Sequence, residues 1–399
     1  MSVTAVAGFD AAGVACGIKA DGSADLAVVA TADRQPVPAA GVFTTNLVCA
    51  APVQVSRMHL SDGRAAAVIV NSGNANAATG EIGRADAERT CDLVASELGC
   101  AATDVLVCST GLIGIPMPMT AVESGVPKLV AALGSDDVAG RAAADAILTT
   151  DTVRKEALVV AELAGGPPLT VGGMAKGAAM LAPAMATMLA VLVTDAHATA
   201  AALHGALEHA VRDTFNALVV DACTSTNDTV LLLANGAAAN APIGPEGHGF
   251  HALVEAVTEA CDELARAMAC DAEGATKLVT IEVRGARSTD DARRAARAVA
   301  SSQLVQCSLY GQDPYWGRVL SELGASGTWF DPERVAIAYN GVTVCRDGIA
   351  ALHDETALAA VMAEREIEIT CDLHQGMGRA RVRFTDLTHA YVDENMGTS

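Results

Sequence analysis

The sequence predicts an α/β protein with a large sheet-and-helix body at 1–275 and a smaller α/β unit at 276–399. In the first part of the chain, short apolar runs typical of buried strands alternate with helical patterns. After about residue 277 the strands become alternating, which is typical of a sheet with one exposed face. The 399 residues are 51% hydrophobic, which is enough to bury a large core.

Five apolar runs are predicted to form buried strands of the body. They are 26–30, 67–70, 105–108, 189–194 and 230–234. Two of them run directly into polar or glycine-rich sequence, NSGNANAATG at 71–80 and STGLIG at 109–114. Loops that a rigid scaffold positions carry binding and catalytic residues more often than the scaffold itself. We therefore expect functional groups at these loops.

Helices are predicted between the strands. One helical repeat is carried by Ala87, Cys91, Val94 and Leu98. Gly99 is expected to end that helix, because glycine readily adopts the left-handed conformation of a C-cap. Helical patterns also occupy 203–211 and 250–268, and the second is the clearest amphipathic pattern of the chain. Pro127 is expected to open a short helix that ends at Leu133.

In the smaller unit, alternating residues at 279–284, 367–371 and 382–384 predict half-exposed strands. Ser288, with Asp291 three residues later, is expected to begin a charged helix. Asn340-Gly341 between two apolar positions predicts a hairpin turn. No linker rich in proline, glycine or serine separates the two parts, so we expect them to pack tightly.

Composition excludes several classes of function. The formal net charge is -21, which disfavours binding to nucleic acid or to anionic membranes. Eleven cysteines occur without a CxxC pair or a Cys/His cluster of metal-binding spacing, so reduced thiols in a cytoplasmic protein are expected. Residues 1–22 lack the basic and then apolar pattern of a secretion signal. We expect no metal site and no membrane span.

The most informative segment is KGAAMLAPAMATMLAVLVTD at 176–195, a loop of small residues that enters an apolar strand. Thr187 lies where the loop meets the strand. From the residues alone, two interpretations stay open: a threonine buried in an ordinary strand, which is common, and a reactive hydroxyl.

Motifs along nearly the whole chain resemble the ornithine acetyltransferase family of the cyclic arginine pathway. The cleavage segment of that family matches Lys176-Gly177, Pro183 and the run Met-Ala-Thr-Met-Leu at 185–189. The other matching motifs follow in order. They are GVFTTN at 41–46, NSGNANA at 71–77, CSTGLIG at 108–114, TTDT at 149–152, TSTNDTVLLLANG at 224–236, EGATK at 273–277 and DPYWGR at 313–318.

The resemblance implies a layered catalytic body of the ornithine acetyltransferase type that cleaves its own backbone between Ala186 and Thr187. The products are an alpha chain, 1–186, and a beta chain, 187–399. Thr187 then carries a free α-amine, whose reference pKa of about 7.7–8.0 lets it act as the base for its own hydroxyl. The acetyl group of N-acetylornithine passes to Thr187 and then to glutamate, in a ping-pong reaction that needs no metal or cofactor.

Site residues follow from the same resemblance. Thr110 and Gly111 are expected to stabilise the oxyanion of the tetrahedral intermediates. The substrate contacts carry over to Thr152, Lys176, Thr187, Glu273, Asn395 and Ser399, with Thr398 as a rival to the last. Lys176 suits the substrate carboxylate and Glu273 suits the ornithine ammonium. The alternative for each of these residues is an ordinary loop position or a solvated surface charge.

Two other functions stay open. A self-cleaving aminopeptidase-like hydrolase shares the related architecture, although Thr187 and the EGATK motif oppose it. An uncleaved binding relative is suggested by Ala178, Ala179 and Ala184, which replace residues usual in the family. Whether acetyl-CoA is a co-substrate also stays open. The family further implies that alpha and beta chains remain together, as a heterotetramer of two of each.

Overall fold

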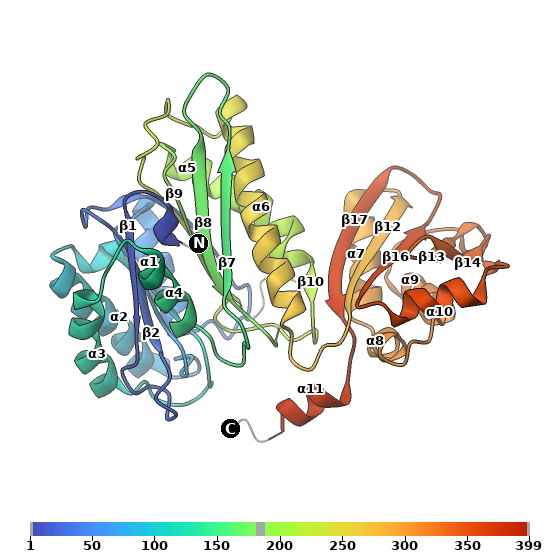
Figure 1. Cartoon of the computed structure of the whole chain (residues 1–399), viewed down its shortest axis with the longest axis horizontal. Coiled ribbons are helices and arrows are strands. Elements are labelled where there is room, and N and C mark those ends of the chain that lie inside the picture. The colour runs from blue at the N-terminus through green and yellow to red at the C-terminus, as the bar shows by residue number, and fades with distance from the viewer. Residues whose placement is uncertain (1–2, 181–187, 397–399) are drawn as a thin grey trace. The chain divides into compact units, whose positions relative to one another are not determined.

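The computed structural model describes residues 3–180 and 188–396 (Figure 1). Its residues group into two compact units. The first contains the described residues up to Gly177, 188–216 and Thr224–Met268. The second contains 178–180, Ala217–Cys223 and the described chain from Ala269 onward. Two short segments from the middle of the chain thus belong to the second unit, and no sequence pattern indicated this.

The first unit holds two sheets, and the predicted α/β class is confirmed. One sheet has the strand order β1-β2-β5-β6. Its strands are β1 Phe9–Val14, β2 Leu26–Thr31, β5 Ala67–Asn71 and β6 Val105–Ser109. The other has the order β4-β3-β11-β9-β8-β7. Its strands are β4 Arg64–Ala65, β3 Val37–Phe43, β11 Thr229–Ala234, β9 Leu189–Thr194, β8 Leu169–Lys176 and β7 Lys155–Ala161.

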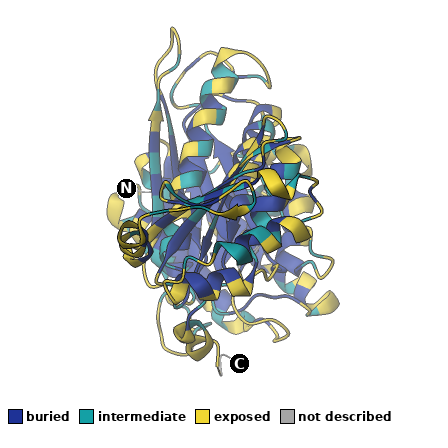
Figure 2. Cartoon of the chain, turned by 90° about the vertical axis from the view of Figure 1, so that its right-hand side faces the viewer, coloured by how far each residue is buried: buried dark blue, intermediate teal, exposed yellow. Residues whose placement is uncertain are grey.

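A hydrophobic core joins the two sheets of the first unit. Val29, Val68 and Leu106 of the first sheet share it with Val191 and Leu231 of the second. Helices α2 (Gly80–Leu98) and α3 (Met119–Ala131) cover the other face of the first sheet. Helices α5 (Ala200–Asp213) and α6 (His248–Cys270) pack on the second sheet, as Figure 1 shows for α6 beside β8. In Figure 2 the strands are mostly buried, while exposed residues gather on outer helix faces and loops.

The pairing of β8 with β9 positions the segment that carries chemistry. The two strands are antiparallel, and Lys176, the last residue of β8, pairs with Leu189, the first residue of β9. On its other side β9 pairs in parallel with β11. All six residues of β9 and of β11 are buried, which explains their uninterrupted apolar sequences.

The predicted strands and most of the predicted helices of the body are confirmed, but the prediction for Pro127 is wrong. Gly99 ends α2 in the left-handed conformation, as expected. Pro127, however, lies inside α3, which begins at Met119. An interior proline loses a backbone hydrogen bond. The buried positions Val122, Val126 and Leu129 pack on the first sheet and outweigh that loss.

Two further helices, α1 (Ala51–His59) and α4 (Asp137–Ala146), complete the unit.

The second unit is built on one sheet with the order β10-β17-β12-β16-β13-β14-β15. The strands are β10 Leu218–Val219, β17 Gly378–Thr385, β12 Leu278–Ala286, β16 Glu366–Asp372, β13 Ala336–Tyr339, β14 Val342–Arg346 and β15 Ile349–Ala350. The helices are α7 Thr289–Ala300, α8 Gln303–Tyr310, α9 Trp316–Ala325, α10 Glu355–Ala363 and α11 His389–Glu394. Ser288 caps α7, and Asn340-Gly341 forms the predicted turn with φ of 41° and 82°.

The prediction that β12 is half-exposed is wrong at Glu282, which is 3% exposed. Arg379 and Arg381 of β17 donate to its carboxylate at 2.7 and 2.6 Å. Burial opposes ionisation of Glu282, but these hydrogen bonds and charges outweigh it and lower its pKa. The two arginines therefore make a buried carboxylate acceptable at this position.

No helix in the described part of the chain is long and apolar enough to cross a membrane. Within 3–180 and 188–396, no group of three His, Cys, Asp or Glu residues is arranged to hold a metal ion.

Candidate active site

Thr110 and Gly111 form a tight turn directly after β6. The backbone N–H of Thr110 donates to the carbonyl of Asn71 at 3.0 Å, so this N–H is already hydrogen-bonded within the protein and is not available to a substrate. The Thr110 hydroxyl has no hydrogen-bond partner among the described residues, and Thr110 is only 4% exposed. Gly111 has φ of +133°, and a Cβ there would lie 2.3 Å from the carbonyl carbon of Gly73. The turn therefore requires glycine, and the hydroxyl of the mostly buried Thr110 is available for an oxyanion.

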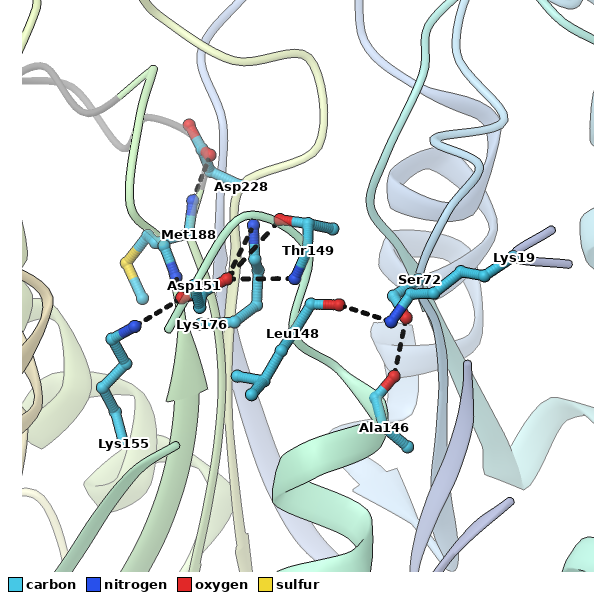
Figure 3. Close-up of polar contacts among 11 residues, drawn as sticks. Lys19, Ser72, Ala146, Leu148, Thr149, Asp151, Lys155, Lys176, Met188 and Asp228 are labelled. Atoms are coloured by element: carbon cyan, nitrogen blue, oxygen red, sulfur yellow. Dashed lines mark hydrogen bonds and ion pairs between the residues drawn. The ribbon is translucent and has the colours of Figure 1, made fainter. Parts of the chain in front are cut away.

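Asn227 and Asp228, which immediately precede β11, link this turn to the start of β9. The Asn227 side-chain amide donates to the carbonyl of Ser109 at 2.9 Å, one residue before Thr110. The Asp228 carboxylate accepts the N–H of Met188 at 2.9 Å (Figure 3). Two consecutive residues thus hold both the Thr110 turn and the first residue described after the predicted cleavage point.

A buried charge cluster lies at the end of β8. Asp151, from the TTDT motif, accepts from the Lys155 ammonium at 2.6 Å and from the Gly177 N–H at 2.7 Å. The Lys176 ammonium lies 3.7 Å from the same carboxylate. Figure 3 shows Asp151 between the two lysines, which come from β7 and β8. The side chains of Asp151 and Lys155 are both 0% exposed.

The cluster carries more positive than negative charge. Burial opposes ionisation of Asp151, but the ammonium groups of Lys176 and Lys155 outweigh it and hold the pKa of Asp151 well below its usual range. Burial lowers the pKa of Lys19, whose ammonium donates to the Leu148 carbonyl at 2.7 Å, just before the TTDT motif. Two ammonium groups around one carboxylate make a local excess of positive charge, which suits an anionic substrate group.

Thr152 follows Asp151 directly and is exposed, unlike the cluster itself. It lines a cleft of about 510 Å³ together with Arg141, Leu148, Val153 and other residues. Lys176, by contrast, lies beside the Asp151 carboxylate and does not line this cleft. A small molecule in the cleft would meet the Thr152 side chain.

In the second unit, Glu273 and Asn395 lie in direct contact. The Asn395 amide donates to the Glu273 carboxylate at 2.7 Å, and Glu273 is 8% exposed. The Glu273 N–H donates to the carbonyl of Ala178 at 2.9 Å. Tyr391 of α11 donates its hydroxyl to Asp221 at 3.2 Å. Burial raises the pKa of Asp221, with the charge of Glu273 adding to the effect. Two predicted substrate contacts are thus brought together here.

Several predicted site positions lie outside the described residues. They are Ala184, the cleavage pair Ala186 and Thr187, and the terminal pair Thr398 and Ser399. Their assignments stay predictions.

Asp151, Asn227 and Asp228 were not singled out from the sequence. Asp151 stands in the TTDT motif beside the predicted contact Thr152, and Asn227 and Asp228 stand in the motif TSTND, from which no residue was assigned a role. A signal for Asp151 was present, since Lys155 follows four residues later and an acid among basic residues in an apolar context needs a partner. Asp228 gave no such signal, because its partner is a backbone N–H forty residues away.

Replacing Asp151 with asparagine is expected to destabilise the protein by about 3–5 kcal/mol, because the change removes the carboxylate charge from two buried ammonium groups. Urea unfolding measures this loss. Asp137→Asn is the matched control, since Asp137 pairs with Arg141 on an exposed helix surface, where an ion pair contributes about 1 kcal/mol or less. Equal stability of the two variants would contradict the account.

The ion pairs of Asp151 with Lys155 and Lys176 also make the stability of the protein depend on pH. A carboxylate with a depressed folded-state pKa contributes stability above its unfolded pKa, which is about 3.9, and loses that contribution as the pH falls toward the folded value. The stability difference between the native chain and Asp151→Asn should therefore be constant near neutral pH. It should shrink only below about pH 4.

Comparisons with known proteins match nearly the whole chain to a single protein family. A model of the ArgJ family matches residues 10–397. The arginine biosynthesis bifunctional protein ArgJ of Mycobacterium tuberculosis (strain ATCC 25618 / H37Rv) is 48% identical over 402 residues, covering 100% of this chain and 96% of the relative. The protein of the same name from Thermobifida fusca (strain YX) is 48% identical over 399 residues, covering 100% of both. The crystal structure of the Bacillus halodurans arginine biosynthesis bifunctional protein ArgJ is 35% identical, with a TM-score of 0.50, and covers 51% of this chain and 96% of that chain.

Proposed function

The chain belongs to the ArgJ family, and from this premise we propose that it transfers the acetyl group of N-acetylornithine to glutamate through an acyl-enzyme on Thr187. It is an enzyme of arginine biosynthesis, as are the relatives that match it from end to end. The family match supports this transferase and supports neither the hydrolase nor the uncleaved binding protein. The products are ornithine and N-acetylglutamate.

The chemistry begins with self-cleavage. The Thr187 hydroxyl attacks the Ala186 carbonyl, the peptide nitrogen leaves as the new α-amine, and water hydrolyses the resulting ester. In the first half of the transfer the α-amine takes the hydroxyl proton as the Thr187 oxygen attacks, and it returns that proton to the departing amine of ornithine. In the second half it takes a proton from the attacking amine of glutamate and gives it to the Thr187 oxygen as the acetyl ester breaks. The Thr110 hydroxyl and a backbone N–H of the Gly111 turn would stabilise the oxyanion.

One observation carries the proposal: Asn227 and Asp228 tie the Thr110 turn to Met188, the residue bonded to Thr187. The predicted oxyanion donors and the predicted nucleophile are far apart in the sequence. A shared two-residue anchor is what a preorganised acyl-transfer site requires, since nucleophile and donors must keep their relative position through the reaction.

The substrate contacts have separate physical support. Lys176 belongs to the charge cluster around Asp151, whose positive excess suits the α-carboxylate that both substrates share. Thr152 lines the adjacent cleft. Glu273, held by Asn395, offers a carboxylate for the ornithine ammonium. We retain Ser399 as the terminal contact from the family pattern.

The relatives carry the name bifunctional protein, which favours a second activity. We propose that glutamate is also acetylated from acetyl-CoA as a co-substrate, with no bound cofactor. We further propose a cytoplasmic enzyme whose alpha and beta chains assemble as a heterotetramer of two of each. Intact-complex mass spectrometry measures the assembly directly.

The function is tested with labelled N-acetylornithine and unlabelled glutamate. The expected product is labelled N-acetylglutamate, formed only when both substrates are present. Labelled free acetate, produced equally well without glutamate, would indicate a hydrolase and contradict the proposal. A parallel reaction with labelled acetyl-CoA and glutamate tests the second activity separately.

A further inference from the structure

Helix α11 is followed directly by Asn395 but has no apolar anchor of its own. Its six residues, His389–Glu394, include no buried residue. A helix this short is not stable in isolation, so contacts with the rest of the second unit must fix its position. That position matters, because Asn395 donates to the carboxylate of Glu273, the proposed partner of the ornithine ammonium. The groups that hold α11 have no role in the mechanism proposed above.

Tyr391 is the residue of α11 on which these contacts converge. Its carbonyl accepts the Asn395 amide at 2.9 Å, and the same amide donates to Glu273 at 2.7 Å. Its hydroxyl donates to the Asp221 carboxylate at 3.2 Å. A Cβ at Gly274 would lie 2.3 Å from the Tyr391 nitrogen, so Tyr391 lies directly against the turn that follows Glu273. The orientation of the Asn395 amide therefore depends on Tyr391.

Asp221 is half-buried, and both of its carboxylate oxygens accept hydrogen bonds. Oδ1 accepts the Cys223 N–H at 3.1 Å, while Oδ2 accepts both the Met180 N–H and the Tyr391 hydroxyl. Burial and the charge of Glu273 raise the pKa of Asp221, and the three donors act in the opposite direction. The donors come from three separate segments of the second unit, so one carboxylate joins all three.

Glu273 contacts two of the same segments. Its N–H donates to the Ala178 carbonyl at 2.9 Å, and its Oε2 accepts the Asn395 amide. Its other oxygen, Oε1, has no hydrogen-bond partner among the described residues. A substrate ammonium would therefore meet a carboxylate that is oriented by Asn395 and, through it, by Tyr391 and Asp221.

We propose that Asp221 is a positioning residue for recognition of the cationic substrate. Through the Tyr391 hydroxyl it fixes α11, and α11 in turn keeps Asn395 on the Glu273 carboxylate. The inference rests on the proposed function, in which Glu273 binds the ornithine ammonium. Because glutamate has no side-chain ammonium, the arrangement should serve N-acetylornithine and not glutamate. Asp221 acts through these residues and needs no contact with the substrate.

The test compares Tyr391→Phe, which removes the hydroxyl that Asp221 accepts, with Tyr310→Phe. Tyr310 is the matched control, because its ring lies 5.9 Å from that of His389, also in α11. Its hydroxyl has no hydrogen-bond partner in the part of the chain that the structure describes. Steady-state rates give kcat/KM for each substrate, which in a ping-pong reaction reports that substrate's own half of the transfer. Asp221→Asn and the double variant complete a double-mutant cycle.

Tyr391→Phe should lower kcat/KM for N-acetylornithine about tenfold and leave the value for glutamate within about twofold of native. Its melting temperature should equal that of the native chain, because α11 buries no residue. Tyr310→Phe should keep native values for both substrates. Asp221→Asn should lower kcat/KM for N-acetylornithine at least as much as Tyr391→Phe does. Addition of Tyr391→Phe to Asp221→Asn should cause no further fall, because the contact is already lost.

A kcat/KM for N-acetylornithine no lower in Tyr391→Phe than in Tyr310→Phe would overturn the inference. So would an equal fall for both substrates, or a further fall of about tenfold in the double variant. If Asp221→Asn does not fold, the comparison of the two tyrosine variants still decides. If the native chain itself transfers no acetyl group, the proposed function fails instead.

Discussion

Thr187→Ala is expected to abolish both self-cleavage and acetyl transfer. The change removes the hydroxyl that attacks Ala186 in the precursor and the acetyl group in the mature enzyme, and without cleavage no α-amine forms. Loss of a nucleophile in acyl-transfer enzymes lowers turnover by about 10⁴-fold or more. Denaturing electrophoresis should show one full-length chain, and the transfer assay should show no product above background.

Thr187→Ser is the matched control, because serine retains the hydroxyl and differs by one methyl group. We expect this variant to cleave, to form the α-amine and to keep measurable transfer. A Thr187→Ala chain that still separates into two fragments, or that transfers acetyl groups at the native rate, would remove Thr187 from the mechanism.

Gly111→Ala is expected to have the second largest effect. A Cβ at this position would lie 2.3 Å from the carbonyl carbon of Gly73 and 2.4 Å from the nitrogen of Asn74, so backbone atoms would have to move. The φ of +133° is also unfavourable for alanine. Displacement of the turn would misplace the Thr110 hydroxyl. Loss of one oxyanion donor lowers turnover by about 10²–10³-fold.

Gly114→Ala separates the effect of backbone strain from the effect of displacing the Thr110-Gly111 turn. Gly114 lies in the same loop and has φ of +83°, but a Cβ there meets nothing within 4 Å. Both variants should lose about 1 kcal/mol of stability from backbone strain, Gly111→Ala should lose more because of its clash with Gly73 and Asn74, and only Gly111→Ala should lose turnover. If both retain native turnover, the Thr110-Gly111 turn has no part in catalysis. Transfer rates at saturating substrate and thermal unfolding give the two measurements.

The parts of the fold that the sequence predicted are those set by local patterns. The apolar runs of β9 and β11 can be explained only by burial on both faces. Asn340-Gly341 and Ser288 form their turn and cap from chemistry within four residues. These features depend on neighbours along the chain, so one sequence is enough to find them.

The parts that escaped prediction depend on distant partners. Glu282 is buried because two arginines from β17 reach it, about a hundred residues later. Pro127 is tolerated inside α3 because the packing of that helix outweighs a lost hydrogen bond. Asp151 and Asp228 contact residues that only the pairing of β7, β8, β9 and β11 brings near. No local pattern carries such information.

The candidate site itself came mainly from family motifs. Thr110 and Gly111 were otherwise an ordinary loop after a strand, and Thr187 was otherwise a threonine at the start of a strand. What the structure adds is that Asn227 and Asp228 connect the strand before the Thr110 turn to Met188, and that Asp151 accepts the Gly177 N–H beside Lys176.

Denaturing mass spectrometry after brief exposure to N-acetylornithine without glutamate tests the central claim most directly. We predict two chains that separate between Ala186 and Thr187, with the chain that begins at Thr187 heavier by one acetyl group. Addition of glutamate should remove that acetyl group. A single uncleaved chain, or two chains that transfer acetyl groups without the beta chain ever carrying one, would contradict a Thr187 acyl-enzyme.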